Sequence, residues 1–271
     1  MDDKYRKTFY RNIGVFTEAE QGRLRRSTVA VAGMGGVGGL LTERLVRLGV
    51  GNLKLTDPGT FEESNLNRQF SSSVRNLGQN KAESVFGQVR DINPEANIYY
   101  STTGIKTEND ANLFVSGSDL VIDEMDYGAW KESIFLQRAA RKRGIYYLFT
   151  SALGFGALVV VFDPNGLTLE EYNKLPLNID LTSVKEMSVP RERILPVMPS
   201  YATAAMSFDM LQEIIGGKRP VPTCSIGVGL TSILAASEAM NIILKRKEII
   251  TAPGYVYIDL LDQKFTVGTV S

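Results

Sequence analysis

The sequence predicts an α/β fold of the Rossmann-like type, an open mixed sheet with a parallel core, antiparallel C-terminal strands and helices on both faces. Residues 28–57 read as a strand, a glycine turn, a helix and a second strand, the order typical of a nucleotide-binding βαβ unit. Strand-like and helical segments alternate as far as residue 162. Residues 255–260 and 264–267 then read as a final pair of strands.

The composition is that of a globular protein, because 44% of the 271 residues are hydrophobic and can bury a substantial core. We expect a single domain over residues 1–271, with an arm and helix in 1–27 and a crossover or lid segment in 167–199. Thirty basic residues balance 30 acidic ones, which argues against nucleic acid as a partner. The longest glycine-free apolar run, residues 157–162, is too short for a membrane span, and the N-terminus has no apolar signal. We therefore expect no membrane partner and a cytoplasmic location.

Two absences restrict the chemistry. The chain has no histidine, which excludes Ser-His-Asp and Cys-His catalysis, HExxH zinc sites and a histidine base. Its single cysteine, Cys224, allows no disulfide within the chain and no CxxC zinc site, so we expect no zinc. A bound metal would need oxygen ligands, and this points to Mg²⁺.

The glycine turn follows a β-branched strand at residues 28–32. Gly33 allows a tight bend and Gly35 allows a ligand to approach the backbone. Gly36 belongs to the same turn, and Gly38 lets the following helix pack close to the sheet. Backbone N–H groups at the start of that helix favour a phosphate. The alternative is a turn that binds nothing.

The second strand, residues 52–57, ends in an acid that suits a ribose hydroxyl pair, Asp57. The polar stretch after it forms neither a helix face nor a strand face and resembles a loop built for polar contacts. We interpret residues 80–91 as a helix and residues 98–100 as the third strand. The alternative for the polar stretch is a solvated linker.

Three carboxylates lie at and just after the end of the fourth predicted strand, residues 120–123. Asp123 is the last residue of the strand, and Glu124 and Asp126 follow it. Ligands of open α/β sheets bind at the carboxyl ends of strands, and crowded acids need a compensating cation. We therefore expect Mg²⁺ or a basic side chain there. A solvated acidic turn is the alternative.

The other segments carry fewer signals. Thr17 and Glu20 have the spacing of a capping box, so a helix should run to about Arg26. Residues 167–199 are rich in proline and lack periodicity, which is typical of a lid or other excursion. The remaining predicted elements are helices at 109–115, 130–143, 200–216 and 229–245 and strands at 145–149 and 157–162.

Taken in order, these motifs make the chain resemble the ThiF/MoeB/E1-like superfamily of ATP-dependent adenylating enzymes. The matching residues are GMGGVG at 33–38, Asp57, SNLNRQF at 64–70, Lys81 and D-x-x-D at 123–126. Arg11-Asn12 also resembles a family motif. Residues 150–172 are most similar to bacterial ThiF-like proteins associated with nitroreductase-like domains.

The resemblance implies a role for each matching residue. ATP would lie over the glycine turn with its ribose on Asp57 and Mg²⁺ on Asp126. The residues implied around the triphosphate are Asn65, Arg68, Gln69 and Lys81. Arg11 would reach the partner's site in a homodimer. The reaction implied is adenylation of a carboxylate on a ubiquitin-like or sulfur-carrier protein, a peptide or a small molecule, with release of pyrophosphate.

The chain also departs from the family pattern. Many relatives carry two CxxC pairs and a cysteine in the crossover segment, and this chain has neither. Adenylation without covalent transfer is therefore the expected activity. The alternatives are an NAD-dependent oxidoreductase, which the glycine turn and Asp57 alone would fit, and a non-catalytic nucleotide-binding scaffold subunit.

Overall fold

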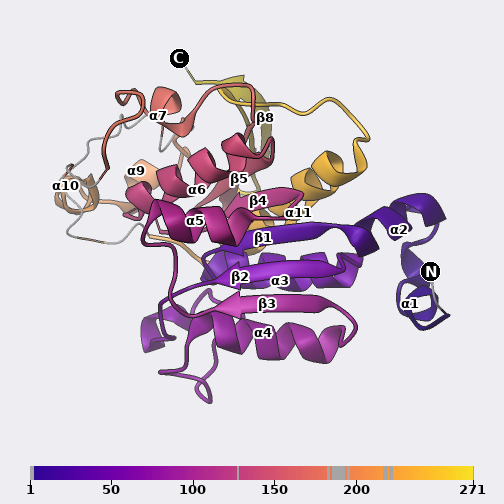
Figure 1. Ribbon diagram of the computed structural model, residues 1–271. Helices are drawn as coiled ribbons and strands as arrows, with labels where there is room; N and C mark the ends of the chain where they lie inside the picture. Colours follow the sequence, from indigo (N-terminus) through magenta and orange to yellow (C-terminus); the bar gives the residue numbers. More distant parts are fainter. Residues whose placement is uncertain are drawn as a thin grey trace.

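The computed structural model describes residues 3–126, 128–181, 184, 193, 196–215, 219 and 222–270. There the chain forms an eight-stranded sheet in the order β3-β2-β1-β4-β5-β6-β7-β8 (Figure 1). The strands are β1 Thr28–Ala32, β2 Asn52–Thr56, β3 Asn97–Ser101, β4 Leu120–Asp123, β5 Tyr146–Leu153, β6 Gly156–Phe162, β7 Gly254–Asp259 and β8 Lys264–Thr269. Strands β1 to β5 pair in parallel, and β6, β7 and β8 extend the sheet antiparallel. This arrangement confirms the predicted fold class.

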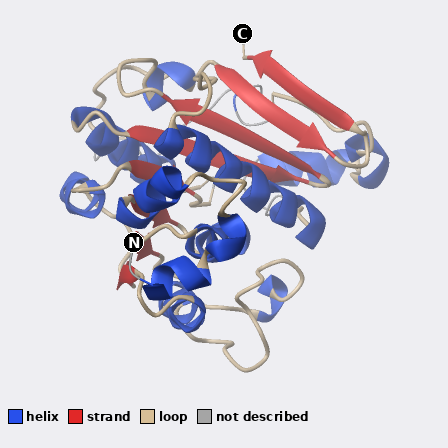
Figure 2. Cartoon of the chain, turned by 90° about the vertical axis from the view of Figure 1, so that its right-hand side faces the viewer, coloured by secondary structure: helices blue, strands red, loops and turns tan. Residues whose placement is uncertain are grey.

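Helices cover both faces of the sheet (Figure 2). One core joins the sheet to α3, α4 and α11, and a second core joins its other face to α5 and α6. The described helices, including the 3₁₀ turns η1 and η2, are α1 Asp3–Thr8, η1 Tyr10–Asn12, α2 Glu18–Arg26, α3 Gly36–Leu48, η2 Glu63–Asn65, α4 Lys81–Ile92, α5 Glu108–Val115, α6 Trp130–Lys142, α7 Leu169–Tyr172, α9 Ala202–Ala205, α10 Phe208–Ile215 and α11 Ser225–Leu244.

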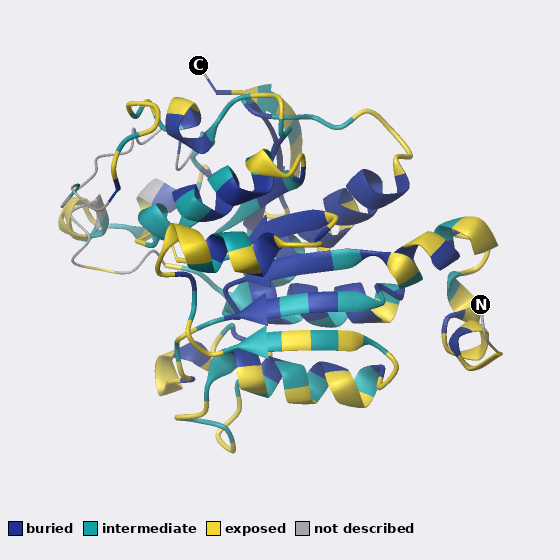
Figure 3. Ribbon diagram, in the orientation of Figure 1, coloured by how far each residue is buried: buried dark blue, intermediate teal, exposed yellow. Residues whose placement is uncertain are grey.

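The sequence of β1 shows why the sheet needs helices on both sides. Val29 and Val31 belong to one core, while Ala30 and Ala32 belong to the other. All four are fully buried, as expected for a central strand of a parallel sheet. The edge strand β3 instead carries exposed residues (Figure 3). The middle of the sheet is thus the buried core from which the loops extend.

The N-terminal helix α2 begins as the sequence predicts. The Glu20 N–H donates to Thr17 Oγ1 at 3.2 Å, and the Thr17 N–H donates to Glu20 Oε2 at 2.8 Å. This reciprocal capping box fixes the start of the helix, which ends at Arg26. The preceding α1 was not predicted.

The predicted helix over 200–216 was wrong in its continuity. The chain forms α9 and α10 instead, with extended backbone at Met206, and residue 216 lies outside the described part. The break arises because Ser207 caps the start of a new helix, α10. Its Oγ accepts from the Met210 N–H at 3.2 Å. The predicted helix over 229–245 begins four residues earlier, at Ser225.

The predicted crossover segment over 167–199 is described only in part, since residues 182–183, 185–192 and 194–195 lie outside the described chain. Its first turn forms α7. Arg138 of α6 anchors that turn through a 2.8 Å ion pair with the buried Glu170. After the gap, Tyr201 donates to the Asp259 carboxylate of β7 at 2.8 Å.

The long helix α11 would pass a test for a membrane span by length and composition alone, the one such helix in the described residues. However, 72% of its most apolar window is buried inside the protein. It packs on α3 and against β5 and β6. Its apolar character is therefore explained by its place in the core.

Two carboxylates fasten the loop after β4 to β5. The Tyr147 hydroxyl donates to Asp123 Oδ2 at 2.5 Å, and burial raises the pKa of both groups. Thr150 Oγ1 lies 2.8 and 2.7 Å from the two carboxylate oxygens of Glu124. Burial, with a smaller contribution from the neighbouring Asp123 charge, raises the pKa of Glu124 to about 8. At neutral pH Glu124 is therefore mostly protonated.

The protonation of Glu124 predicts how stability depends on pH. Its pKa is raised from 4.5, so its stabilisation is complete below pH 4.5 and is lost as the pH rises toward 8. We expect Glu124→Gln to be more stable than wild type by a margin that grows above about pH 5 and levels off above about pH 8. Urea unfolding across this range measures the margin. The exposed Glu248→Gln is the control, and parallel stability profiles for wild type and Glu124→Gln would contradict the assignment.

Candidate functional site

The strand β1 ends in a turn that only glycine can form. Gly33 has a φ of +93°, and a Cβ there would lie 2.3 Å from the backbone oxygen of Glu124. A Cβ on Gly38 would lie 1.8 Å from the Gly33 carbonyl oxygen. The first turn of α3 and the loop after β4 therefore both pack directly against the glycine turn.

The middle of the turn is more open. The nearest atom to a Cβ on Gly35 would be Gln69 Nε2, at 3.9 Å, whereas a Cβ on Gly36 would lie 3.1 Å from Val228 of α11. Gly35 is also the N-cap of α3. The first backbone N–H groups of this helix therefore lie beside the uncrowded part of the turn at Gly35. These groups and the helix dipole make the turn suitable for a phosphate.

Asp57 follows β2 and lies beside the same turn. Its two carboxylate oxygens accept from the Met34 N–H at 2.6 Å and the Gly59 N–H at 2.7 Å. Asn80 Nδ2 donates to the carbonyl oxygens of Asp57 and Gly59, at 2.9 and 3.1 Å. This link holds Lys81, the first residue of α4, close by: a Cβ on Gly59 would lie 3.7 Å from Lys81 Nζ and 3.1 Å from Asp57 Oδ1.

The polar loop at 64–70 folds against the glycine turn. Asn65 is buried and accepts from the Glu62 N–H at 3.1 Å, so it caps η2. The half-buried Arg68 donates to the Ser64 carbonyl and to Asn67 Oδ1, both at 2.9 Å. Gln69 is buried next to Gly35, and its Oε1 has no hydrogen-bond partner within the described chain. An orphaned acceptor beside this turn is suited to a ligand that donates hydrogen bonds.

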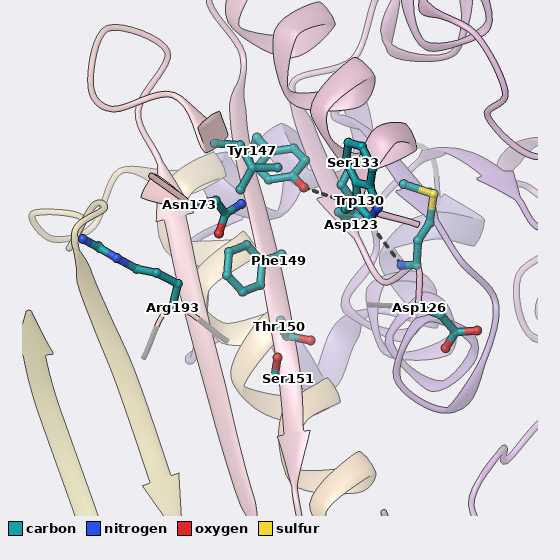
Figure 4. Close-up of a pocket in the computed structure, with 12 residues that line it drawn as sticks. Asp123, Asp126, Trp130, Ser133, Tyr147, Phe149, Thr150, Ser151, Asn173 and Arg193 are labelled. Atoms are coloured by element: carbon teal, nitrogen blue, oxygen red, sulfur yellow. Dashed lines mark hydrogen bonds between the residues drawn. The ribbon is translucent and has the colours of Figure 1, made fainter. Parts of the chain in front are cut away.

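Asp126 lies on the loop after β4 at the mouth of a cavity of about 120 Å³ (Figure 4). Its side chain is exposed. The described cavity lining comes from this loop, α6, β5 and the crossover segment: Asp123, Met125, Asp126, Trp130, Ser133, Tyr147, Phe149, Thr150, Ser151, Leu169, Asn173 and Arg193. Within the described residues, no group of three or more His, Cys, Asp or Glu side chains could hold a metal.

Arg11 lies far from the glycine turn of its own chain. It is exposed in η1, between α1 and α2, which occupy the end of the sheet opposite the arrowheads of β1 and β2 (Figure 1). The glycine turn follows the carboxyl end of β1. Arg11 therefore cannot reach this turn within one chain.

The structure gathers most of the predicted site residues at the carboxyl edge of the parallel strands. The residues brought together are Gly33, Gly35, Gly36, Gly38, Asp57, Asn65, Arg68, Gln69 and Lys81. Asp126 joins this edge because it lies two residues after Glu124, whose backbone touches Gly33. Sequence reasoning missed the aromatic and hydroxyl side chains of the cavity. The available signal was the alternate spacing of Tyr147, Phe149 and Ser151 on one face of β5.

Solved structures share this fold over the whole chain. A structure of E. coli MccB with ATP superposes with a TM-score of 0.71 at 17% identity, over 100% of this chain and 72% of that chain. A structure of PaaA gives a TM-score of 0.73 at 17% identity, over 100% of this chain and 75% of that chain. At this identity the similarity shows the fold.

Curated relatives are more similar in sequence. The chain is 33% identical to the tRNA threonylcarbamoyladenosine dehydratase of Haemophilus influenzae, over 90% of this chain and 96% of that protein. Identity to the enzyme of the same name from Bacillus subtilis is 37%, over 45% of this chain and 47% of that protein. Identity to the SAMP-activating enzyme E1 of Haloferax volcanii is 38%, over 39% of each chain. The ThiF family matches residues 9–271. This match and the glycine turn at the carboxyl edge of the sheet lead to one conclusion: the chain belongs to the ThiF family.

Proposed function

We propose that this protein uses ATP and Mg²⁺ to adenylate a carboxylate and releases pyrophosphate. The observation that carries the proposal is the grouping of the glycine turn, Asp57 and Lys81 at the edge of the sheet that also carries the Asp126 loop. Backbone N–H groups and a lysine suit phosphates, and a carboxylate at the end of β2 suits ribose hydroxyls. ThiF-family membership supports the same activity.

The reaction needs positive charge more than a base. One oxygen of the acceptor carboxylate attacks the α-phosphorus, the bond between that phosphorus and the bridging oxygen breaks, and pyrophosphate leaves with the electron pair. No proton moves, so the lack of histidine is no obstacle. Lys81 and Arg68 would offset charge on the phosphates, and Lys81 is already held beside Asp57.

The residues present fit a nucleotide. Gln69 Oε1 is buried with no partner in the described chain, as expected for an acceptor that waits for a ligand donor. The Asp57 oxygens each accept one backbone N–H and retain further lone pairs for hydroxyl groups. Asn65 caps η2 through Oδ1, and its Nδ2, which donates to Ser64 Oγ at 3.4 Å, is the group that could donate to a phosphate oxygen.

Asp126 fits Mg²⁺ because this ion is commonly held by one or two carboxylates together with substrate phosphates and water. A single exposed carboxylate beside the phosphate turn meets that need, whereas a metal cage built only from protein is not required. When bound, the ion would neutralise charge on the phosphates.

The acceptor carboxylate belongs to a protein, a peptide or a small molecule, such as the C-terminus of a ubiquitin-like or sulfur-carrier protein. A second candidate is a carboxylate carried by tRNA. The relative from Haemophilus influenzae, whose name states a tRNA substrate, matches over 90% of this chain and supports that candidate. The equal numbers of acidic and basic residues favour the first.

The two other readings of the sequence are less favoured. An NAD-dependent oxidoreductase would leave Lys81 and Asp126 without a role at the phosphates, and the family match does not support it. A non-catalytic scaffold subunit would not need the complete set of nucleotide-site residues.

We further propose that the protein acts as a homodimer in which Arg11 completes the site of the partner. The position of Arg11 at the opposite end of the sheet supports this arrangement, since the side chain cannot serve its own glycine turn. A cation supplied from a second subunit would strengthen charge neutralisation at the phosphates.

Lys81→Ala should weaken ATP binding about tenfold and slow ATP–pyrophosphate exchange on the order of 10²-fold, because one cation is lost at the phosphates. Calorimetric titration with ATP and Mg²⁺ measures the first effect. Lys7→Ala, which removes an exposed lysine of α1, should leave both unchanged. Wild-type protein that bound NAD and ignored ATP would overturn the proposed function.

Asp126→Asn should remove the Mg²⁺ dependence of ATP binding and leave metal-free binding close to that of wild type. The amide keeps the shape of the side chain but supplies one weak oxygen in place of a carboxylate. Titrations with ATP in Mg²⁺ or in chelator compare the two states. Asp91→Asn, at an exposed position of α4, is the control. An unchanged magnesium effect in Asp126→Asn would remove the metal assignment.

Mixing subunits tests whether Arg11 acts across a dimer. Arg11→Ala and Asp126→Ala proteins should each be inactive, and a random mixture should recover about a quarter of wild-type exchange, because half of the dimers hold one intact site. Exchange would be followed with an accepted carboxylate after subunit mixing. No recovery despite heterodimer formation, shown by differently tagged subunits, would place Arg11 outside the partner's site.

A further inference from the structure

The cavity beside Asp126, here called the β5 pocket, has a size and lining that the nucleotide does not explain. Its volume of about 120 Å³ is close to that of engineered cavities of about 150 Å³ that admit a single benzene ring. Pockets for whole drug-sized ligands are about 300 Å³ or larger. The β5 pocket therefore suits one side chain.

Aromatic side chains form firm walls. Phe149 contacts Phe162 with ring centroids 6.0 Å apart and meets Tyr172 edge-on at the same distance. Trp130 lies at the start of α6, on the side of the pocket near the Asp126 loop (Figure 4). Tyr147 is buried and held by its bond to Asp123. Rings restrained in this way present a preformed apolar surface.

The polar groups of the pocket are mainly uncharged. Ser133, Thr150 and Ser151 contribute hydroxyls, and the Asn173 amide points toward Phe149 (Figure 4). Three charged side chains also line the pocket: Arg193, whose guanidinium lies over the Tyr172 ring, 5.2 Å from the centroid, Asp123, which accepts from Tyr147, and the exposed Asp126. An uncharged occupant matches this lining better than an acidic or basic one.

The position of the pocket assigns its occupant. Asp126 is at its mouth, and the loop that carries Asp126 touches Gly33 of the phosphate turn. A carboxylate that attacks the α-phosphorus must therefore lie between the turn and the pocket, with the rest of the acceptor extending from there. The part of the acceptor nearest the pocket is then the substituent on the carbon next to the carboxylate.

We propose that the β5 pocket holds the side chain of the C-terminal residue of a peptide acceptor, and that this residue is branched or aromatic and uncharged rather than glycine. The inference rests on the proposed function and narrows its acceptor class. Glycine would leave the apolar walls of the pocket without contacts.

The experiment uses Trp130, the only tryptophan of the chain, as a reporter inside the pocket. The full-length protein, with Mg²⁺ and α,β-methylene-ATP, is titrated with the peptides Ala-Ala-Ala-Phe, Ala-Ala-Ala-Leu and Ala-Ala-Ala-Gly. A C-terminally amidated Ala-Ala-Ala-Phe lacks the carboxylate. Since the analogue cannot release pyrophosphate, the fluorescence change reports binding without turnover.

We expect saturable fluorescence changes with the Phe and Leu peptides at concentrations at least about tenfold lower than with the Gly or amidated peptide, a difference of about 1.4 kcal/mol. Ser151→Leu, which fills the pocket from β5, should abolish this preference and leave binding of the nucleotide analogue unchanged by calorimetry. Ser116→Leu, at an exposed position beyond α5, is the matched control and should behave as wild type.

Equal binding of the Gly and Phe peptides, or an unchanged preference in Ser151→Leu, would overturn the inference but not the proposed function. Competition between the nucleotide analogue and the Phe peptide would assign the pocket to the base. A response to tRNA and to none of the peptides would assign this surface to RNA and overturn the inference. Failure of the analogue to bind at all would overturn the proposed function as well.

Discussion

The absence of a side chain at Gly33 holds the site together. Gly33 extends β1 and Glu124 follows β4, so the two residues leave neighbouring strands of the sheet. They approach so closely that any Cβ would overlap the Glu124 carbonyl. The glycine turn and the Asp126 loop therefore pack directly against each other. In the proposed reaction, preorganisation of this kind would lower the barrier, because charged groups would not need to move.

The electrostatics around this contact are consistent with a ligand that carries several negative charges. Burial keeps the Glu124 carboxyl mostly protonated at neutral pH, so it adds little negative charge beside the turn. Asp123 is buried and accepts a hydrogen bond from Tyr147. Asp126 is the exposed carboxylate of the three, the one available to an ion from solvent. Of the two aspartates of the D-x-x-D motif, Asp123 is thus buried in a hydrogen bond, whereas Asp126 faces solvent.

The sequence predicted the local parts of the molecule well, because their signals are contiguous. The glycine turn, the capping box at Thr17 and the parallel strands all follow from adjacent residues. The β5 pocket could not be predicted in this way, since its walls come from four segments that only the folded chain brings together. The break between α9 and α10 was missed because the cap at Ser207 competed with a continuous apolar pattern.

The packing of the last described helix, α11, affects how the chain folds during synthesis. Val228 of α11 fills the space opposite Gly36, and α11 packs along α3 over much of its length. The N-terminal half of the Rossmann unit therefore lacks one wall until α11 has been synthesised. Contacts between such distant segments slow folding. A nascent chain that ends before α11 would expose the apolar face of α3, and exposed apolar surface makes incompletely folded chains prone to aggregate.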